Sequence, residues 1–201
     1  MRKGELPSRR SPEWESWTSG ALGWRTAQIA AIHVRSWQAA YQGLLPQAYL
    51  DGLDPGPRAV RWERNLSATD WSRGGILVAE ADEQLLGFVS YGPARDEDVD
   101  ASRDGEVYAI YLRPGAWGQR TGQQLMTAAL EGLGEAGYGQ AILWVLADNT
   151  RARRFYEAGG WLADGAVKRL PTSTSPPSAR TSPAWPTAPR LIVRGTTAAP
   201  R

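Results

Sequence analysis

The order of strand-type and helix-type hydrophobic patterns between residues 75 and 167 is the feature that most constrains the fold of this chain. Two short β-rich runs, residues 76–79 and 85–91, flank a polar stretch and predict a hairpin. The patterns that follow alternate between the two types: a strand over 106–112, a helix over 121–135, an apolar strand over 141–146, a short helix over 150–158 and a strand over 161–167. This order predicts an α+β (mixed α/β) fold in which helices flank a central mixed sheet.

The chain has 201 residues, which fits one domain, and we expect that domain over residues 25–168. Before the first strand, helices are predicted over 26–41, 46–53 and 58–66, and Pro55, Gly56 and Pro57 are expected to break the second of them. Residues 1–24 are a poorly defined N-terminal segment.

A change of composition marks residues 169–201, which hold half of the 14 prolines among Ser, Thr and Arg. Such a segment can bury little apolar surface. We therefore expect a largely disordered tail, in which only residues 191–193 could form a short strand.

Composition also excludes several kinds of site. The chain has no cysteine and one histidine, His33, so a thiolate nucleophile is excluded and no metal centre is expected. There is no run of about 18 apolar residues that could span a membrane, and the N-terminus lacks the apolar core of a secretory signal. A cytoplasmic protein without a membrane contact is the resulting prediction.

The formal net charge of +2 is unevenly distributed. Residues 171–201 carry four arginines and no acid, so the rest of the chain is slightly acidic. Basic tails are usually solvated, and this one lacks the interleaved aromatic residues that are typical of nucleic-acid-binding segments. Nucleic acid is therefore a poor candidate partner, although an interaction or nucleic-acid-binding module using the tail stays open as an alternative.

A glycine-bearing turn joins the strand over 106–112 to the helix that begins at Thr121. Gly118 and Gly122 allow a ligand to approach the backbone closely, and the free N–H groups of a helix N-terminus favour a phosphate. The spacing fits neither the GxGxxG nor the GxxxxGK[ST] pattern. Taken alone, this turn is equally consistent with an ordinary strand-to-helix connection.

A second motif follows about 27 residues after that turn. Asn149, Ala152, Tyr156, Gly160 and Trp161 fit the pattern N-x-x-A-x-x-x-Y-x-x-x-G-F/W. Together the two motifs resemble the GCN5-related N-acetyltransferase (GNAT) family, and the resemblance covers about residues 27–167. It implies a central, mostly antiparallel sheet with splayed parallel central strands.

The resemblance implies an acyl-CoA-dependent N-acetyltransferase with acetyl-CoA as co-substrate. In that family the pantetheine arm lies between the two splayed strands, here 106–112 and 141–146, and the pyrophosphate lies on backbone N–H groups of the turn. Carried over residue by residue, the predicted cofactor-binding residues are Ile110, Tyr111, Leu112, Trp117, Gly118, Gln119, Arg120, Thr121, Gly122 and Asn149.

One position departs from the family pattern Q/R-x-x-G-x-G/A. The chain has Trp117 at the first place and Arg120 where the middle glycine belongs. Arg120 keeps its N–H and adds a charge that can meet a phosphate, but its Cβ crowds the closest approach of the ligand. We therefore expect acetyl-CoA binding that is weakened rather than abolished.

Direct transfer to an amine needs a base, a donor for the developing oxyanion and a proton for the departing thiolate. By resemblance, Tyr156 supplies that proton. Glu106, at the start of a central strand, is the candidate general base acting through water, although an acid at a strand end is often merely solvated. Asn149 either contacts the cofactor or caps the helix that begins at Thr150, and both roles can coexist.

Trp37, Tyr41 and Tyr91 are candidates to line the acceptor pocket, although aromatic residues at such spacing more often belong to the core. The acidic loop over 94–104 could attract a cationic amine. The predicted acceptor is a primary amine of a small molecule or peptide, which attacks directly in a ternary complex. The main alternative is a CoA-binding protein of the same fold with little or no turnover.

Members of the family normally end with two more strands after the Gly-Trp pair, where this chain has its proline-rich tail. This leaves open that the terminal strands are missing, and one hypothesis is that the tail is a foreign ending from a shifted reading frame. Pairing of residues 191–193 in the sheet would refute that hypothesis. If strands are missing, a second subunit could supply them, which makes a homodimer a further prediction.

Overall fold

The computed structural model describes residues 13–16, 23–82, 84–169 and 187–194. Their strands form one seven-stranded sheet in the order β1-β2-β3-β4-β5-β7-β6. The strands are β1 Glu13–Ser16, β2 Gly75–Ala81, β3 Gln84–Pro93, β4 Asp104–Leu112, β5 Gln140–Trp144, β6 Leu162–Arg169 and β7 Thr187–Arg194. Neighbouring strands are antiparallel except β4 and β5, which are parallel. The predicted mixed, mostly antiparallel sheet with a parallel central pair is confirmed.

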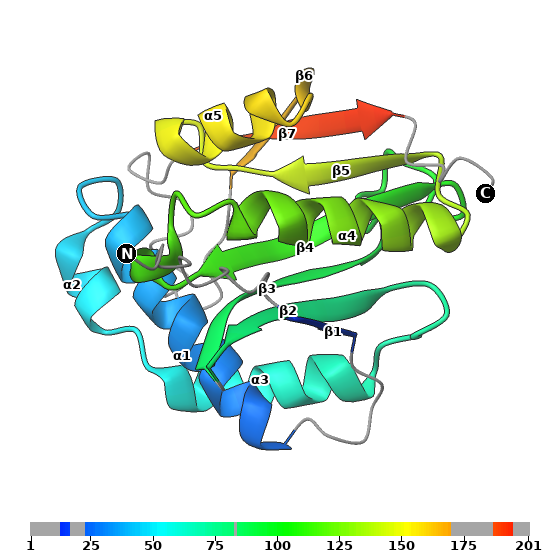
Figure 1. Ribbon diagram of the computed structural model, residues 1–201. Coiled ribbons are helices and arrows are strands. Elements are labelled where there is room, and N and C mark those ends of the chain that lie inside the picture. The colour runs from blue at the N-terminus through cyan, green and yellow to red at the C-terminus, as the bar shows by residue number, and fades with distance from the viewer. Residues whose placement is uncertain (1–12, 17–22, 83, 170–186, 195–201) are drawn as a thin grey trace, which may run out of the picture.

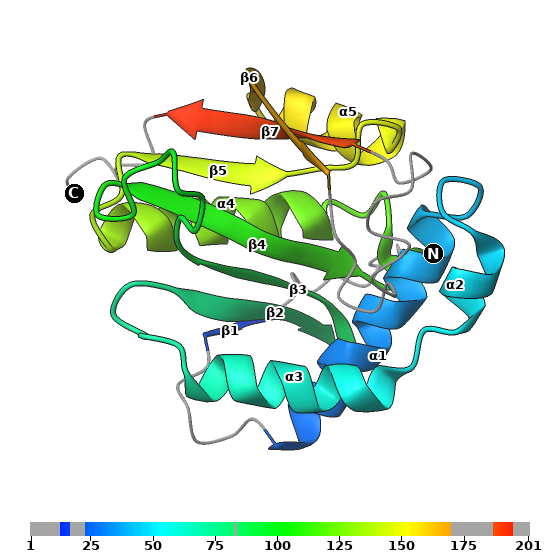
Figure 2. The same ribbon diagram turned by 180° about the vertical axis from the view of Figure 1, so that it is seen from behind.

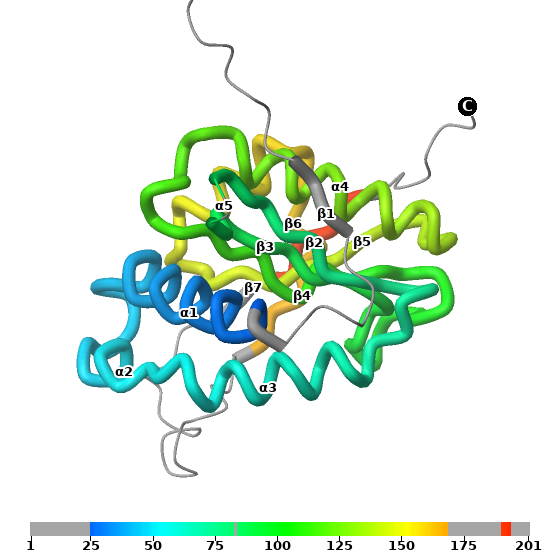
Figure 3. The backbone as a smooth tube through the Cα atoms, turned by 60° about the horizontal axis from the view of Figure 1, so that its bottom comes forward, coloured from blue at the N-terminus to red at the C-terminus, as the bar shows by residue number. Residues whose placement is uncertain are grey.

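Helices cover both faces of this sheet (Figures 1 and 2). They are α1 Gly23–Ala40, α2 Gln47–Asp51, α3 Pro55–Ser67, α4 Thr121–Glu135 and α5 Thr150–Ala158, with a short 3-10 turn, η1, at Pro114–Ala116. The pair α1 and α3 lies on one face, side by side in Figure 3, and α4 and α5 lie on the other.

Each face of the sheet has its own apolar core. Leu125, Ala129 and Leu133 of α4 are fully buried against β-strand residues such as Val89. On the opposite face, Ile29 of α1 packs with buried residues of α3 and β2. The strand alternation that sends neighbouring side chains to opposite faces is what lets both helix layers bury their apolar stripes.

The bounds of α4 and α5 agree with the predicted helices 121–135 and 150–158. The second predicted helix does end before Pro55, because α2 ends at Asp51. The third helix, predicted from Arg58, begins three residues earlier, at Pro55. Proline is tolerated in the first helical turn because no intrahelical acceptor exists there for its missing N–H. Asp54 caps this start, since its Oδ1 accepts from the Gly56 N–H at 2.8 Å.

The C-terminal strand β7 lies between β5 and β6 (Figure 1, red). Leu191, Ile192 and Val193 pair with Leu143, Ile142 and Ala141 of β5, and Leu191 is buried. The expectation of missing terminal strands is therefore wrong, because β6 and β7 follow the Gly-Trp pair and complete the sheet. Pairing of residues 191–193 also refutes the hypothesis of a shifted reading frame. The rest of the predicted disordered tail lies outside the described residues.

Candidate functional site

The sheet opens between its two parallel strands. Pairing of β4 with β5 covers only residues 104–106 opposite 140–142, whereas β4 continues to Leu112. The β3–β4 register changes at the same place, because Ser90 pairs with Ala109 but Tyr91 pairs with Val107. Tyr108 is thus an extra residue, a β-bulge, and such a bulge bends its strand away from the previous direction. The predicted splayed strands are present, and the bulge accounts for where they part.

A cavity of about 470 Å³ occupies this opening. Its walls are β4 from residue 107 to 112, the end of β5, the turn before α4, and α5. It brings together most of the predicted cofactor-binding residues, namely Ile110, Tyr111, Leu112, Trp117, Gly118, Arg120, Gly122 and Asn149. Two predicted residues do not line it: the Gln119 amide donates to the Gly115 carbonyl at 2.9 Å, and Thr121 is buried.

The turn before α4 presents unpaired backbone donors. The first hydrogen bond of the helix runs from the Gln124 N–H to the Arg120 carbonyl at 3.0 Å. Among the described residues, the N–H groups from Gly118 to Gln123 find no acceptor, and no side chain caps the helix. Gly118, Arg120 and Gly122 border the cavity. Free donors at a helix N-terminus form a site suited to an anion such as a phosphate.

Arg120 adopts a backbone conformation that favours glycine. Its φ of 66° is left-handed, and Gly118 also has a positive φ, 78°. At the position where this chain departs from the family motif, the backbone thus keeps a conformation that favours glycine. For a residue with a Cβ, this conformation costs about 1–2 kcal/mol of folding free energy. The Arg120 side chain is exposed at the cavity wall.

On the α5 side, Asn149 caps its helix, because its Oδ1 accepts from the Ala152 N–H at 3.0 Å. Two residues missed in the sequence also line the cavity. The Arg151 guanidinium lies 3.9 Å from the ring centre of Trp117. The Phe155 ring packs beside Gly122, close enough that a Cβ added at Gly122 would be in van der Waals contact with it. Both positions are variable in the family motif, so the sequence did not single them out and only the fold shows that they line the cavity.

Three tyrosines converge at the inner end of the cavity. Tyr41, Tyr111 and Tyr156 all border it and interact electrostatically with one another. Burial is the main cause that raises the pKa of each hydroxyl, with the neighbouring Tyr111 adding to the effect on Tyr156. The Tyr156 hydroxyl therefore stays protonated at neutral pH, which is the form that can donate a proton.

A second cavity, of about 820 Å³, adjoins the first on the α1–α3 face. Tyr41, Tyr108 and Tyr111 border both cavities. Of the predicted acceptor residues, Trp37 and Tyr41 line this second cavity and pack edge to face with ring centres 4.9 Å apart.

Tyr91 is placed differently. Tyr91 also borders the second cavity, but its hydroxyl lies against α4, where a Cβ added at Gly132 would come within 2.3 Å of it. The Tyr91 hydroxyl is thus on the α4 face of the sheet, and no ring contact of Tyr91 with Trp37 or Tyr41 is present among the described residues.

Glu106 is buried at the edge of the second cavity. Both of its oxygens accept from Arg95, at 2.7 Å from Nη2 and 3.0 Å from Nε, and the Arg95 backbone N–H adds a third bond at 3.1 Å. The Arg95 guanidinium also lies 3.9 Å from the ring centre of Tyr108. Glu106, the predicted base, is thus held in an ion pair at the edge of the second cavity.

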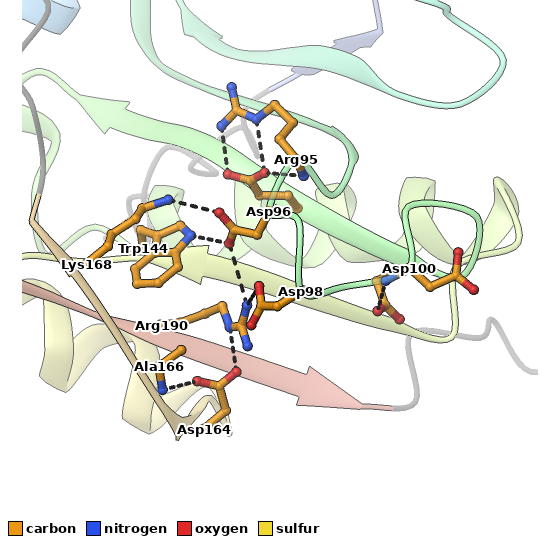
Figure 4. Close-up of polar contacts among 11 residues, drawn as sticks. Arg95, Asp96, Asp98, Asp100, Trp144, Asp164, Ala166, Lys168 and Arg190 are labelled. Carbon is orange, nitrogen blue, oxygen red and sulfur yellow. Dashed lines mark hydrogen bonds and ion pairs between the residues drawn. The ribbon is translucent and has the colours of Figure 1, made fainter.

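The acidic loop over 94–104 is tied to the C-terminal strands (Figure 4). Asp96 accepts from the Trp144 indole N–H at 2.6 Å and lies 3.2 Å from Lys168 of β6. Arg190 of β7 lies 2.7 Å from Asp98. Two acids of the loop, Asp96 and Asp98, thus already have cationic partners and are less able to attract a cationic amine. Among the described residues, Glu97, Asp100 and Asp104 form no ion pair.

In the part of the chain that the structure describes, no group of three or more His, Asp or Glu side chains is arranged to hold a metal ion. The described helices also include none with the length and apolarity needed to cross a bilayer.

A mixed sheet that parts between two parallel strands, with a donor-rich helix start at the opening, defines the GNAT fold. The comparison with family models agrees: residues 34–161 match the Acetyltransferase (GNAT) family. The chain belongs to this family.

Known proteins similar to this chain carry related descriptions. An uncharacterized N-acetyltransferase, YuaI, of Bacillus subtilis is 33% identical over 131 residues, which are 65% of this chain and 70% of that protein. A mycothiol acetyltransferase of Sanguibacter keddieii is 41% identical over 88 residues, which are 44% of this chain and only 28% of that protein.

Solved structures show the same fold at low identity. The PaiA N-acetyltransferase from Thermoplasma acidophilum, in complex with coenzyme A, has a TM-score of 0.66 at 16% identity and covers 92% of this chain and 99% of its own. The protein yncA from Salmonella typhimurium, with its cofactor acetyl-CoA, has a TM-score of 0.64 at 15% identity, with coverages of 96% and 99%.

Proposed function

We propose that this chain transfers the acetyl group of acetyl-CoA to a primary amine of a small molecule or peptide, by direct attack in a ternary complex. The observation that carries the proposal is the row of free backbone N–H groups from Gly118 to Gln123 at the mouth of the opening between β4 and β5. Membership of the family and the coenzyme A or acetyl-CoA held by two structural neighbours support it.

In this proposal the diphosphate of acetyl-CoA accepts hydrogen bonds from those N–H groups, with the Arg120 and Arg151 side chains available for its charge. The pantetheine arm enters between β4 and β5, along the β4 edge left unpaired beyond Glu106. One acceptor on this edge is partly used already, because the Leu112 carbonyl accepts from the Trp117 indole N–H at 3.2 Å. The thioester then lies near Tyr156, where the two cavities meet.

The proposed chemistry is a nucleophilic acyl substitution. The neutral amine nitrogen attacks the thioester carbonyl carbon and forms a C–N bond, while the carbonyl oxygen gains negative charge. The C–S bond then breaks, the amide carbonyl re-forms, and the thiolate takes a proton from Tyr156. The amine releases a proton to the base, and Tyr156 is reprotonated from solvent, so charge and protons balance.

Glu106 stays the proposed base, acting through water from the edge of the second cavity. Arg95 fills three of the four lone-pair sites of Glu106, and its charge stabilises the carboxylate, so movement of Arg95 would favour proton acceptance. The Arg95 side chain is 62% exposed in contrast to 4% for Glu106, so such a movement needs no repacking of the core.

Two measurements test the proposal. Acetyl-CoA should raise the melting temperature of the full chain, because a ligand that binds only the folded state stabilises it. Release of free CoA thiol should then depend on an added amine. Stabilisation without thiol release for any amine in a broad panel would favour the alternative of a CoA-binding protein with little turnover. Absence of any stabilisation at millimolar acetyl-CoA would contradict the proposal itself.

The acceptor and a cytoplasmic location stay predictions. A homodimer also stays untested, but its stated reason, missing terminal strands, is removed by β6 and β7 in the sheet. The alternative of a nucleic-acid-binding tail predicts salt-sensitive binding that is lost on removal of residues 171–201.

A further inference from the structure

The second cavity carries unpaired positive charge. Arg58 and Arg61, both on α3, line it. In the described residues neither has a carboxylate within ion-pair distance, whereas Arg95 and Lys168, the other cations of this wall, are paired with Glu106 and Asp96. Of the two carboxylates that border the cavity, Glu106 is thus already matched by a cation, and the other, Asp70, is exposed and hydrogen-bonded to Ser72. The cavity wall is therefore positive where α3 meets α1.

His33 of α1 lies beside these arginines with both ring nitrogens facing donors. The buried Trp62 indole N–H donates to Nδ1 at 3.3 Å, and Nη1 of Arg58 lies 3.3 Å from Nε2. A neutral imidazole has one N–H and one acceptor nitrogen. Because an indole N–H can only donate, Nδ1 is the acceptor, and the ring proton is on Nε2.

The Nε2–H of His33 and the guanidinium of Arg58 are then two donors that face one another with no acceptor between them. Burial, together with the charges of Arg58 and Arg61, lowers the pKa of His33 to about 3, so the ring stays neutral at physiological pH. A change in the charge of His33 therefore does not resolve this meeting of two donors. An oxygen anion from a ligand would accept from both donors at once, and charge-assisted bonds of this kind are strong.

We infer that His33, Arg58 and Arg61 form a carboxylate-binding subsite, and that the acceptor is an amine which also carries a carboxylate, such as an amino acid. This inference rests on the proposed acetyl transfer and names the class of its acceptor.

The position of the subsite fits that class. The imidazole of His33 stacks on Tyr111 with ring centres 4.5 Å apart, and Tyr111 borders both cavities. A carboxylate held at His33 and Arg58 thus lies one aromatic ring away from the junction where the thioester is proposed, a spacing suited to an amine and a carboxylate on one small molecule. Trp37, whose ring centre lies 5.1 Å from the Arg58 guanidinium, closes the aromatic wall beside it.

The test compares matched acceptors on the full chain with saturating acetyl-CoA. A panel of amino acids is assayed beside their carboxamides and their decarboxylated amines, with release of CoA thiol as readout. We expect kcat/KM to be higher for the amino acids, and Arg58→Gln to lower it by about 10- to 100-fold for them alone. Arg64→Gln, an exposed arginine on the same helix that does not border the cavity, is the matched control and should change nothing.

A binding experiment with reaction products tests the carboxylate subsite separately from the proposed acetyl transfer, because it needs no turnover. N-acetyl amino acids and their carboxamides are titrated calorimetrically into the wild type and Arg58→Gln in the presence of CoA. Carboxylate-selective binding that Arg58→Gln weakens supports the subsite even if no amine is turned over. The subsite is refuted if carboxamides or decarboxylated amines serve equally well, if neither product binds, or if Arg58→Gln and Arg64→Gln behave alike while both melt like the wild type.

Discussion

Replacement of Arg120 by glycine should make the unliganded protein more stable. A left-handed backbone costs a residue with a Cβ about 1–2 kcal/mol, and Arg120 has a φ of 66°. Glycine in turn loses about 0.4–1 kcal/mol of stability, because it gives the unfolded chain more conformational entropy. The difference between the mid-range values is a net gain of about 0.8 kcal/mol, within a range of about 0–1.6, which raises the melting temperature of a chain of this size by about 2–3 °C.

The assay is thermal unfolding of the apo protein followed by circular dichroism, so that effects of the Arg120 charge on ligand binding do not enter. Arg120→Ala is the matched control: it removes the charge from the N-terminus of α4 but keeps the Cβ, and so keeps the backbone cost. Arg120→Gly should therefore melt above both Arg120→Ala and the wild type. Equal or lower stability of Arg120→Gly would refute the account of a strained turn at this position.

Three further substitutions test the site and the contacts around it. Tyr156→Phe should lower kcat by about 100-fold or more with little change in acetyl-CoA affinity, because it removes the proton donor alone. The raised pKa of Tyr156 also predicts that the wild-type rate does not decline near pH 10, where a free tyrosine ionises. Arg190→Gln should lower the melting temperature by about 4–8 °C, because the shielded carboxylate of Asp164 loses its charged partner, a cost of about 2 kcal/mol. Between about pH 6.5 and pH 3 the unfolded state binds a proton at His33, whereas the folded state, with a His33 pKa of about 3, does not. The stability of the wild type therefore falls as the pH drops through this range, and His33→Phe should make that fall less steep.

Each of these has a contrary outcome. Undiminished turnover by Tyr156→Phe would remove Tyr156 from its proposed role. An unchanged melting temperature for Arg190→Gln would show that the loop in Figure 4 is not held by that ion cluster. Wild type and His33→Phe with parallel stability curves from pH 7 to pH 4 would show that His33 is not kept neutral by the fold.

The order of elements could be predicted because hydrophobic period and turn residues are local signals. Helix α4 begins and ends where its apolar spacing does, and Asn149 marks the start of α5 through its cap. The family motif then allowed the opening between β4 and β5 to be predicted, as well as most residues of its wall.

The features that were missed depend on tertiary structure. The bulge at Tyr108 has no residue-type signal, since any residue can be the extra one in a strand. The meeting of His33 with Arg58, 25 residues apart, follows only from the packing of α1 on α3. The ion pairs of Asp96 and Asp98 come from Lys168 of β6 and Arg190 of β7. The proline-rich sequence around β7 gives no local signal that these strands pair in the sheet.

The central claim is that the backbone N–H groups from Gly118 to Gln123 bind the diphosphate of acetyl-CoA. Amide hydrogen exchange with and without acetyl-CoA measures those groups directly. We predict fast exchange over 118–123 in the unliganded protein and strong protection there when acetyl-CoA is bound. Saturation with acetyl-CoA that leaves exchange over these residues unchanged would contradict the account.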